Sequence, residues 1–169
     1  YIYYLKIRDE LGRERIFKGV NACFKPKDIN QRNVKWKGYD KLFDSLESNG
    51  VNIVRLGFTW SMLEPIENQY DSKAFDMLKN YVKLCKDKGI YVLLDLHQDL
   101  FYCNKGIGDG APDWATKEYK KKHPLLIWAE GYFYMKDIQR AFNDFWDNKN
   151  GMQDKVISLW ERIALEFSG

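Results

Sequence analysis

Short apolar runs alternate along this chain with longer stretches in which apolar residues recur every three or four positions. The short runs predict strands buried on both faces, as in parallel sheets covered by helices. These runs occupy residues 16–20, 51–58 and 90–95. Helical spacing is found at residues 39–49, 71–88 and 138–167, with a polar interruption at 147–151. Residues 1–19 alternate on both sides of an Asp- and Gly-containing turn, which predicts a β-hairpin whose second arm continues into the first run.

The predicted order is therefore a hairpin followed by three strand–helix units. Repeating βα units imply a parallel sheet with right-handed crossovers. An open doubly wound sheet and a (β/α)8 barrel both fit this order. Polar residues follow all three predicted strands, and a barrel gathers such residues from every strand, whereas an open sheet concentrates them at one switch point. We therefore expect an α/β fold, the first part of a TIM barrel.

A complete barrel of this kind typically needs about 250 residues. The sequence has 169 residues. We therefore expect residues 1–169 to be the N-terminal portion of a single longer domain, truncated before the fourth strand.

The third predicted strand ends abruptly in polar residues, Asp95, His97, Gln98 and Asp99. Such side chains are costly to bury in a core, and in α/β folds this edge is where ligands bind. A hydrogen-bonded structural histidine is the alternative interpretation of His97. The flanking carboxylates make a binding site an equally good interpretation.

The first two predicted strands carry comparable residues. Asn21 and Lys25 follow the first strand; a turn-forming Asn and a surface Lys are the simpler interpretation of each taken singly. Arg55 lies inside the apolar part of the second strand. A buried guanidinium needs a carboxylate partner, so Arg55 forms either a structural ion pair or one that orients a catalytic carboxylate.

Composition excludes several classes of function. The net charge is only +3, with hydrophobic content of 45% and charged content of 30%, which indicates a globular chain and no nucleic-acid partner. The three cysteines have neither the spacing of a metal site nor an even count, and one disulfide stays possible. The glycines at 106–110 lack the spacing of a phosphate loop, so we reject a nucleotide site there and expect residues 100–136 to be a long substrate-facing insertion.

Several stretches taken together resemble endoglycoceramidase-related members of glycoside hydrolase family 5. In chain order they are residues 17–21 with Lys25, residues 52–58, Trp60, Glu64-Pro65, residues 94–99, residues 110–115, residues 141–146, residues 151–154 and Trp160. Each motif alone is weak, but their order and spacing over nearly the whole chain make the set specific. The His-Gln-Asp run at 97–99 is the most diagnostic.

The resemblance implies a (β/α)8 barrel that hydrolyses a β-glycosidic bond with retention, using one glutamate as acid/base and another as nucleophile. In the family the acid/base follows the fourth strand in an Asn-Glu-Pro motif, and the nucleophile follows the seventh. Neither position lies within residues 1–169, and Glu64-Pro65 lacks the preceding Asn. We therefore expect no catalytic residue in this chain and no catalysis from it alone.

The resemblance also implies roles for residues that are present. Arg55 would orient the nucleophile, and Lys25, His97 and Asp99 would hydrogen-bond sugar hydroxyls through charge-assisted bonds. Asn21 is a further candidate for that network. Trp146 is a candidate to offer a flat apolar face to the sugar, although its helical spacing fits core packing equally well.

The implied substrate is a glycosphingolipid, with glucosylceramide or a sterol glucoside as the alternative within the family. A non-catalytic carbohydrate- or lipid-binding remnant is the alternative of another class, and a metal-dependent barrel enzyme ranks last because one strand-end histidine offers poor ligation. No cofactor is implied, and transient contact with a membrane surface would suit a lipid substrate. The oligomeric state is not indicated, and location depends on whether a signal peptide precedes residue 1: a secreted or lysosome-like compartment if it does, the cytoplasm if not.

Overall fold

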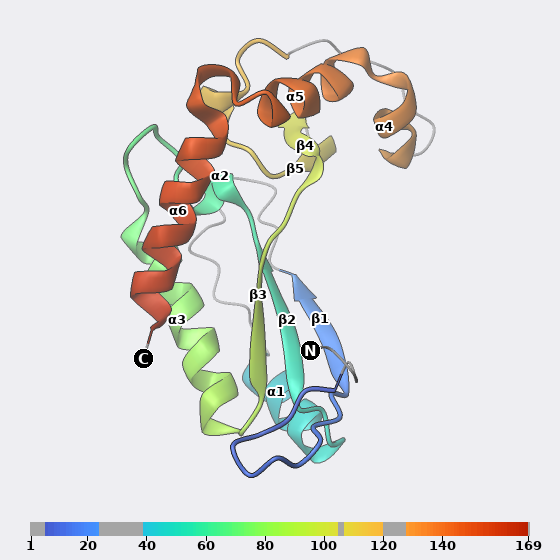
Figure 1. The fold of residues 1–169 in the computed structure, drawn as a ribbon, viewed down its shortest axis with the longest axis vertical. Coiled ribbons are helices and arrows are strands. Elements are labelled where there is room, and N and C mark those ends of the chain that lie inside the picture. Colours follow the sequence, from blue (N-terminus) through green and yellow to red (C-terminus); the bar gives the residue numbers. More distant parts are fainter. Residues whose placement is uncertain (1–5, 24–38, 105–106, 120–127, 169) are drawn as a thin grey trace.

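We analysed a computed structural model of the chain, which describes residues 6–23, 39–104, 107–119 and 128–168 (Figure 1). The strands are β1 (Gly19–Cys23), β2 (Ile53–Phe58), β3 (Tyr91–Leu96), β4 (Asp99–Asn104) and β5 (Ile107–Asp109). The α-helices are α1 (Tyr39–Ser48), α2 (Trp60–Leu63), α3 (Ser72–Asp87), α4 (Gly131–Tyr134), α5 (Lys136–Trp146) and α6 (Met152–Phe167). Short 3-10 turns lie at Asp113–Ala115, Trp128–Glu130 and Lys149–Gly151.

Three parallel strands in the order β1–β2–β3 form the main sheet. Helices α3 and α6 lie along one side of it (Figure 1). The predicted strand–helix alternation and parallel pairing are confirmed. Gly50 and Gly89 follow α1 and α3 with positive φ, a conformation that costs glycine little.

The helix-covered face of the sheet carries the core. Val54, Leu56 and Phe58 alternate along β2 and are completely buried. The Phe58 ring meets Trp160 of α6 edge to face. Cys85 on α3 is also completely buried as a free thiol, and this burial raises its pKa to about 11.

The opposite face of the sheet, which we call the open face, carries apolar side chains that stay exposed among the described residues. Tyr91 and Leu93 of β3 are 53% and 55% exposed. Strand β1 begins three residues later than predicted, and in it only Ala22 is fully buried. Apolar runs predict a capacity for burial on both faces, but within the described parts of the chain helices cover only one.

The structure also departs from a simple strand–helix order in two places, near the N-terminus and after β2. Near the N-terminus, one antiparallel bridge between Arg8 and Glu14 replaces a hairpin ladder among the residues described there. Asp9 closes that turn by accepting the backbone N–H groups of Leu11 and Arg13. The segment after β2 contains the short helix α2 rather than a continuous loop.

The expected insertion at 100–136 contains helices and strands in its described residues. It contains the antiparallel pair β4–β5 and the helix α4, and α5 packs against β4 beyond the C-terminal ends of the main strands (Figure 1). No helix in the described portion of the chain is both long and apolar enough to span a bilayer.

Candidate functional site

The strand register brings polar residues together on the open face. Asn21 of β1, Arg55 of β2 and Leu93 of β3 form one row across the sheet, and Cys23, Gly57 and Asp95 form the next row toward the C-terminal edge. Residues two apart on a strand share a face. Arg55 and Asp95 therefore meet at the C-terminal edge, on the face that the helices leave open.

Asp95 links the arginine to the histidine that follows β3. One carboxylate oxygen, Oδ2, lies 2.8 Å from Nη2 of Arg55 and 3.0 Å from Nδ1 of His97. Nη2 and Nδ1 are themselves 3.4 Å apart. Nη2 can only donate, and with a proton on Nδ1 both nitrogens donate to Oδ2 of Asp95. The Nη2–Nδ1 contact then joins two donors and is not a hydrogen bond.

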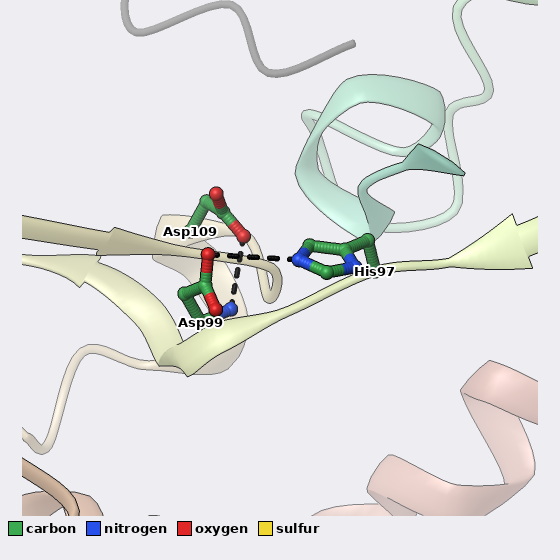
Figure 2. A group of neighbouring side chains, drawn as sticks. All are labelled: His97, Asp99 and Asp109. Atoms are coloured by element: carbon green, nitrogen blue, oxygen red, sulfur yellow. Dashed lines mark hydrogen bonds and ion pairs between the residues drawn. The ribbon is translucent and has the colours of Figure 1, made fainter. Parts of the chain in front are cut away.

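The other imidazole nitrogen faces a second carboxylate. Nε2 of His97 lies 3.5 Å from Oδ2 of Asp99, and the Asp99 backbone N–H donates to Oδ1 of Asp109 at 2.9 Å (Figure 2). Arg55, Asp95, His97, Asp99 and Asp109 thus form a continuous polar chain. Such a chain presents charged donors and acceptors at one edge, which suits a ligand rich in hydroxyl groups.

His97, Asp99 and Asp109 each offer a metal-ligating atom, and these atoms lie within 4.8 Å of one another. One nitrogen and two carboxylate oxygens are ligands that divalent transition metals accept. The hydrogen bond from Asp99 to Asp109 and the contacts of His97 with Asp95 and Asp99 already hold the three side chains in place.

Gly57 lies directly beneath the side chains of Cys23 and Asp95. A Cβ atom at this position would lie 2.4 Å from Sγ of Cys23 and 3.3 Å from Oδ2 of Asp95. The glycine thus lets the Cys23 and Asp95 side chains lie over the middle strand. A glycine inside an apolar strand is a sequence signal for such a close approach, and it was missed.

The structure places the other predicted site residues as follows. Asn21 is exposed and opposes Arg55 in the strand register. Trp146 lies at the end of α5 and is 70% exposed, with its ring edge to face with Phe145. The end of α5 thus leaves this side chain largely exposed, and its contact with a sugar stays a prediction. Lys25 lies outside the described residues.

Glu64 is buried, and its carboxylate is engaged in hydrogen bonds within the fold. It is only 2% exposed; Oε2 accepts the Trp60 Nε1–H at 2.8 Å and Oε1 accepts the Asn68 N–H at 2.8 Å. The Trp114 Nε1–H donates to the Glu64 carbonyl at 2.9 Å, and the two tryptophan rings pack edge to face. These contacts join α2 to the segment after β5.

Comparison with known proteins supplies the family. The family model described as Cellulase (glycosyl hydrolase family 5) matches residues 11–169. The chain belongs to glycosyl hydrolase family 5. The predicted fold class, a partial (β/α)8 barrel, is confirmed by the parallel sheet and by the family 5 neighbours.

Several named proteins are similar to most of this chain. The endoglycoceramidase of Cyanea nozakii is 30% identical over 188 residues, covering 94% of this chain and 36% of that protein. The glucosylceramidase of Aspergillus fumigatus is 36% identical over 149 residues, covering 71% of this chain and 20% of that protein. The structure of endo-glycoceramidase II from Rhodococcus sp. in complex with ganglioside GM3 has a TM-score of 0.80 and 26% identity, covering 96% of this chain and 39% of that one. The chain thus spans less than two-fifths of each.

Proposed function

We propose that the protein is a retaining β-glycosidase that hydrolyses the glycosidic bond of glycosphingolipids. The observation that carries the proposal is the convergence of Arg55, His97 and Asp99 at the C-terminal edge of the sheet, in a chain similar to endoglycoceramidases. In family 5 barrels, as in barrels generally, this edge is the place for the active site. Residues 1–169 would form the N-terminal part of one catalytic domain, with both catalytic glutamates beyond residue 169.

Arg55 would orient the nucleophile. A guanidinium has five N–H donors in a fixed fork, and the contact with Asp95 engages Nη2. The remaining donors suit a second carboxylate placed above the sheet. A nucleophilic glutamate held there would stay ionised beside the positive charge and could attack the anomeric carbon to form the covalent intermediate of a retaining mechanism.

His97 and Asp99 would hold the sugar next to the bond that is cleaved. Their side chains are 18% and 24% exposed, so each is held by neighbours while still reachable from solvent. Lys25, Asn21 and Trp146 would complete the same subsite, the first two by hydrogen bonds and Trp146 by its exposed ring. A lipid substrate would bring the protein transiently to a membrane surface.

A glucosylceramide or sterol-glucoside β-glucosidase is the second candidate, and the similarity to the glucosylceramidase of Aspergillus fumigatus favours it. The two candidates differ in the sugar released. An endo-acting enzyme removes the whole oligosaccharide from the ceramide, whereas a glucosidase needs a single glucose. A non-catalytic carbohydrate- or lipid-binding protein is the alternative outside catalysis.

The test uses the full-length protein with lactosylceramide and glucosylceramide in mixed micelles. Release of intact lactose supports the endo-acting enzyme, and cleavage of glucosylceramide alone supports the second candidate. NMR of the first-formed sugar should show the β-anomer if the mechanism is retaining. A sterol glucoside is assayed as a third substrate, because its cleavage also supports the second candidate. Binding of these lipids without cleavage of any of them would contradict both enzymes and favour the binding protein.

The variant Asp99→Asn tests whether glycolipid cleavage depends on this site. Loss of one charge-assisted hydrogen bond typically costs about 1.5–3 kcal/mol, so we expect kcat/KM to fall about 10- to 100-fold. Asp76→Asn, which changes an exposed carboxylate on α3, is the matched control and should leave kcat/KM within the error of measurement. Equal losses in both variants would remove the assignment of Asp99 to the sugar site.

A further inference from the structure

The backbone that follows Asp99 adopts an unusual turn. Leu100 and Phe101 have φ angles of 58° and 66°, and their side chains are 1% and 5% exposed. Two successive bulky apolar residues with positive φ are rare, because the left-handed conformation brings Cβ too close to the backbone. Such a turn persists only where its surroundings hold it.

Several contacts hold this turn. Oε1 of Gln98 accepts the Phe101 N–H at 2.7 Å, and the Tyr132 hydroxyl accepts the Leu100 N–H at 3.0 Å. The Ala111 N–H donates to the Phe101 carbonyl at 2.7 Å. The Gln98 side chain, helix α4 and the segment after β5 therefore each hold this turn with a hydrogen bond.

Strand β5 lies directly against this turn because glycines flank Asp109. A Cβ atom on Gly108 would lie 2.6 Å from the carbonyl oxygen of Asp99, and one on Gly110 would lie 2.6 Å from Cβ of Gln98. Both glycines also have positive φ. Because neither neighbour of Asp109 carries a side chain, β5 can approach β4 closely, and the Asp109 carboxylate reaches the backbone of Asp99.

Asp109 contacts the backbone of Asp99, and Asp99 contacts the imidazole. Oδ1 of Asp109 accepts the Asp99 N–H at 2.9 Å, while Oδ2 of Asp99 lies 3.5 Å from Nε2 of His97 (Figure 2). We propose that Asp109 is a positioning residue, which holds the backbone of Asp99 so that the Asp99 carboxylate stays beside His97 and in reach of the sugar. This inference rests on the proposed function, since it assigns Asp109 to the same sugar site.

A carboxylate suits this role better than an amide, because a charged acceptor makes a stronger bond to a backbone N–H. An asparagine would still offer its Oδ1 to the same N–H, whereas an alanine would leave the N–H without this partner. The two substitutions therefore separate a positioning role from direct contact with the substrate. Direct contact through the negative charge would be lost in both.

The test compares Asp109→Ala, Asp109→Asn, Asp99→Asn and the double variant D99N/D109A in the full-length protein. We expect Asp109→Ala to lower kcat/KM about 10- to 100-fold, and Asp109→Asn to lower it by less than about threefold. In the Asp99→Asn background, Asp109→Ala should add less than about threefold, because it acts through a carboxylate that is already gone. The drop in Tm from Asp109→Ala should be the same in both backgrounds.

Two kinetic outcomes would overturn the proposal. If Asp109→Asn loses as much as Asp109→Ala, and the loss adds to that of Asp99→Asn, then Asp109 contacts the substrate itself. If Asp109→Ala lowers Tm but leaves kcat/KM unchanged for the folded fraction, the residue has only a structural role.

A second readout separates this inference from the proposed function. In full-length protein with ¹⁵N-labelled histidine, the Nε2 signal of His97 (assigned with His97→Gln) should shift in Asp109→Ala in the same direction as in Asp99→Asn. It should stay close to its wild-type position in Asp109→Asn. If the wild-type protein cleaves no glycolipid, the proposed function fails, and this signal still decides the role of Asp109. An unchanged Nε2 signal in Asp109→Ala overturns the positioning role whether or not the protein is an enzyme.

Discussion

The two faces of the main sheet use alternate residues of the same strands for opposite purposes. Along β2, Val54, Leu56 and Phe58 face the helices and are completely buried. Between them, Arg55 and Gly57 face the open side, where they meet Asp95. Because successive residues of a strand point to opposite faces, the same strand contributes core residues to one face and polar site residues to the other.

The open face also changes along its length. Tyr91 lies at the N-terminal ends of the strands, Leu93 and Arg55 share the middle row, and Asp95 and His97 lie toward the C-terminal ends. If the longer protein closes a barrel, as we propose, the apolar end would become barrel core and the polar end would become the active-site floor. The comparison thus predicts how substitutions on each face affect stability.

The largest expected effect is on the covered face. Leu56→Ala removes a completely buried side chain and should lower the free energy of unfolding by about 2–5 kcal/mol, since the lost transfer energy and the residual cavity add. Leu93→Ala changes the same residue type on the open face, where the side chain is 55% exposed. In the 169-residue chain we expect this variant to cost less than about 1 kcal/mol. Urea unfolding of both variants provides the measurement.

The same pair tests the proposed barrel. In a longer protein that closes the barrel, Leu93 would be buried, and Leu93→Ala should then cost nearly as much as Leu56→Ala. Equal costs already in the 169-residue chain would contradict the exposure of the open face. A small cost of Leu93→Ala in the longer protein would contradict the closed barrel.

The next effect is steric and lies on the open face itself. Gly57→Ala places a Cβ atom 2.4 Å from Sγ of Cys23 and 3.3 Å from Oδ2 of Asp95. Overpacking of this kind typically costs about 1–3 kcal/mol. The double variant Gly57→Ala with Cys23→Gly removes the closest clash and should recover part of the loss in Tm, after correction for Cys23→Gly alone. No recovery would show that Asp95, not Cys23, limits the space above Gly57.

A smaller effect concerns a carboxylate outside both faces. Oδ2 of Asp144 on α5 accepts the Tyr119 hydroxyl at 2.6 Å and the Lys149 ammonium at 2.9 Å. These bonds, the one from Tyr119 foremost, hold the pKa of Asp144 below its ordinary value of 3.8. Its stabilisation is therefore present above pH 3.8 and is lost as the pH falls through the lowered pKa.

Asp144→Asn should thus lower stability by about 1 kcal/mol at neutral pH. The difference in Tm between wild type and variant should narrow as the pH falls below 3.8. Asp76→Asn on the exposed side of α3 is the control and should show no such narrowing. A difference that stays constant down to acid pH would contradict the assigned direction of the pKa shift. Unlike the carboxylates on the open face, Asp144 should not affect glycoside cleavage.

The sequence predicted the elements that have strong hydrophobic periodicity. Helices α3, α5 and α6 and strands β2 and β3 lie within a few residues of their expected positions, because each buries one apolar side against the core. The location of Arg55, His97 and Asp99 at the carboxyl edge was also predictable, because polar side chains interrupt or end apolar strands there. The prediction of a parallel sheet followed from the strand–helix alternation.

The remainder depends on contacts that no local pattern encodes. The exposure of Leu93 depends on what covers the open face, and apolar character alone predicts the opposite. Asp109 reaches Asp99 through the pairing of β4 with β5, and β4 itself contains two successive positive φ angles at the bulky residues Leu100 and Phe101, which sequence rules would avoid. Glu64 showed no partner in the sequence, and its partners Trp60 and Asn68 were identified only from the fold.

The smallest expected effect on stability belongs to Arg55, the residue most directly tied to the proposed chemistry. Its side chain is 38% exposed and that of Asp95 is 20% exposed, and partly exposed ion pairs typically contribute about 0–1 kcal/mol. Arg55→Met keeps much of the aliphatic length of the side chain, so Tm should change little, whereas cleavage of lactosylceramide by the full-length protein should be nearly abolished if Arg55 orients the nucleophile. Arg55→Lys keeps the charge but loses the planar fork, so it should recover stability fully and activity only in part. Full activity in Arg55→Met would show that Arg55 does not orient the nucleophile. Its role would then be limited to the ion pair with Asp95.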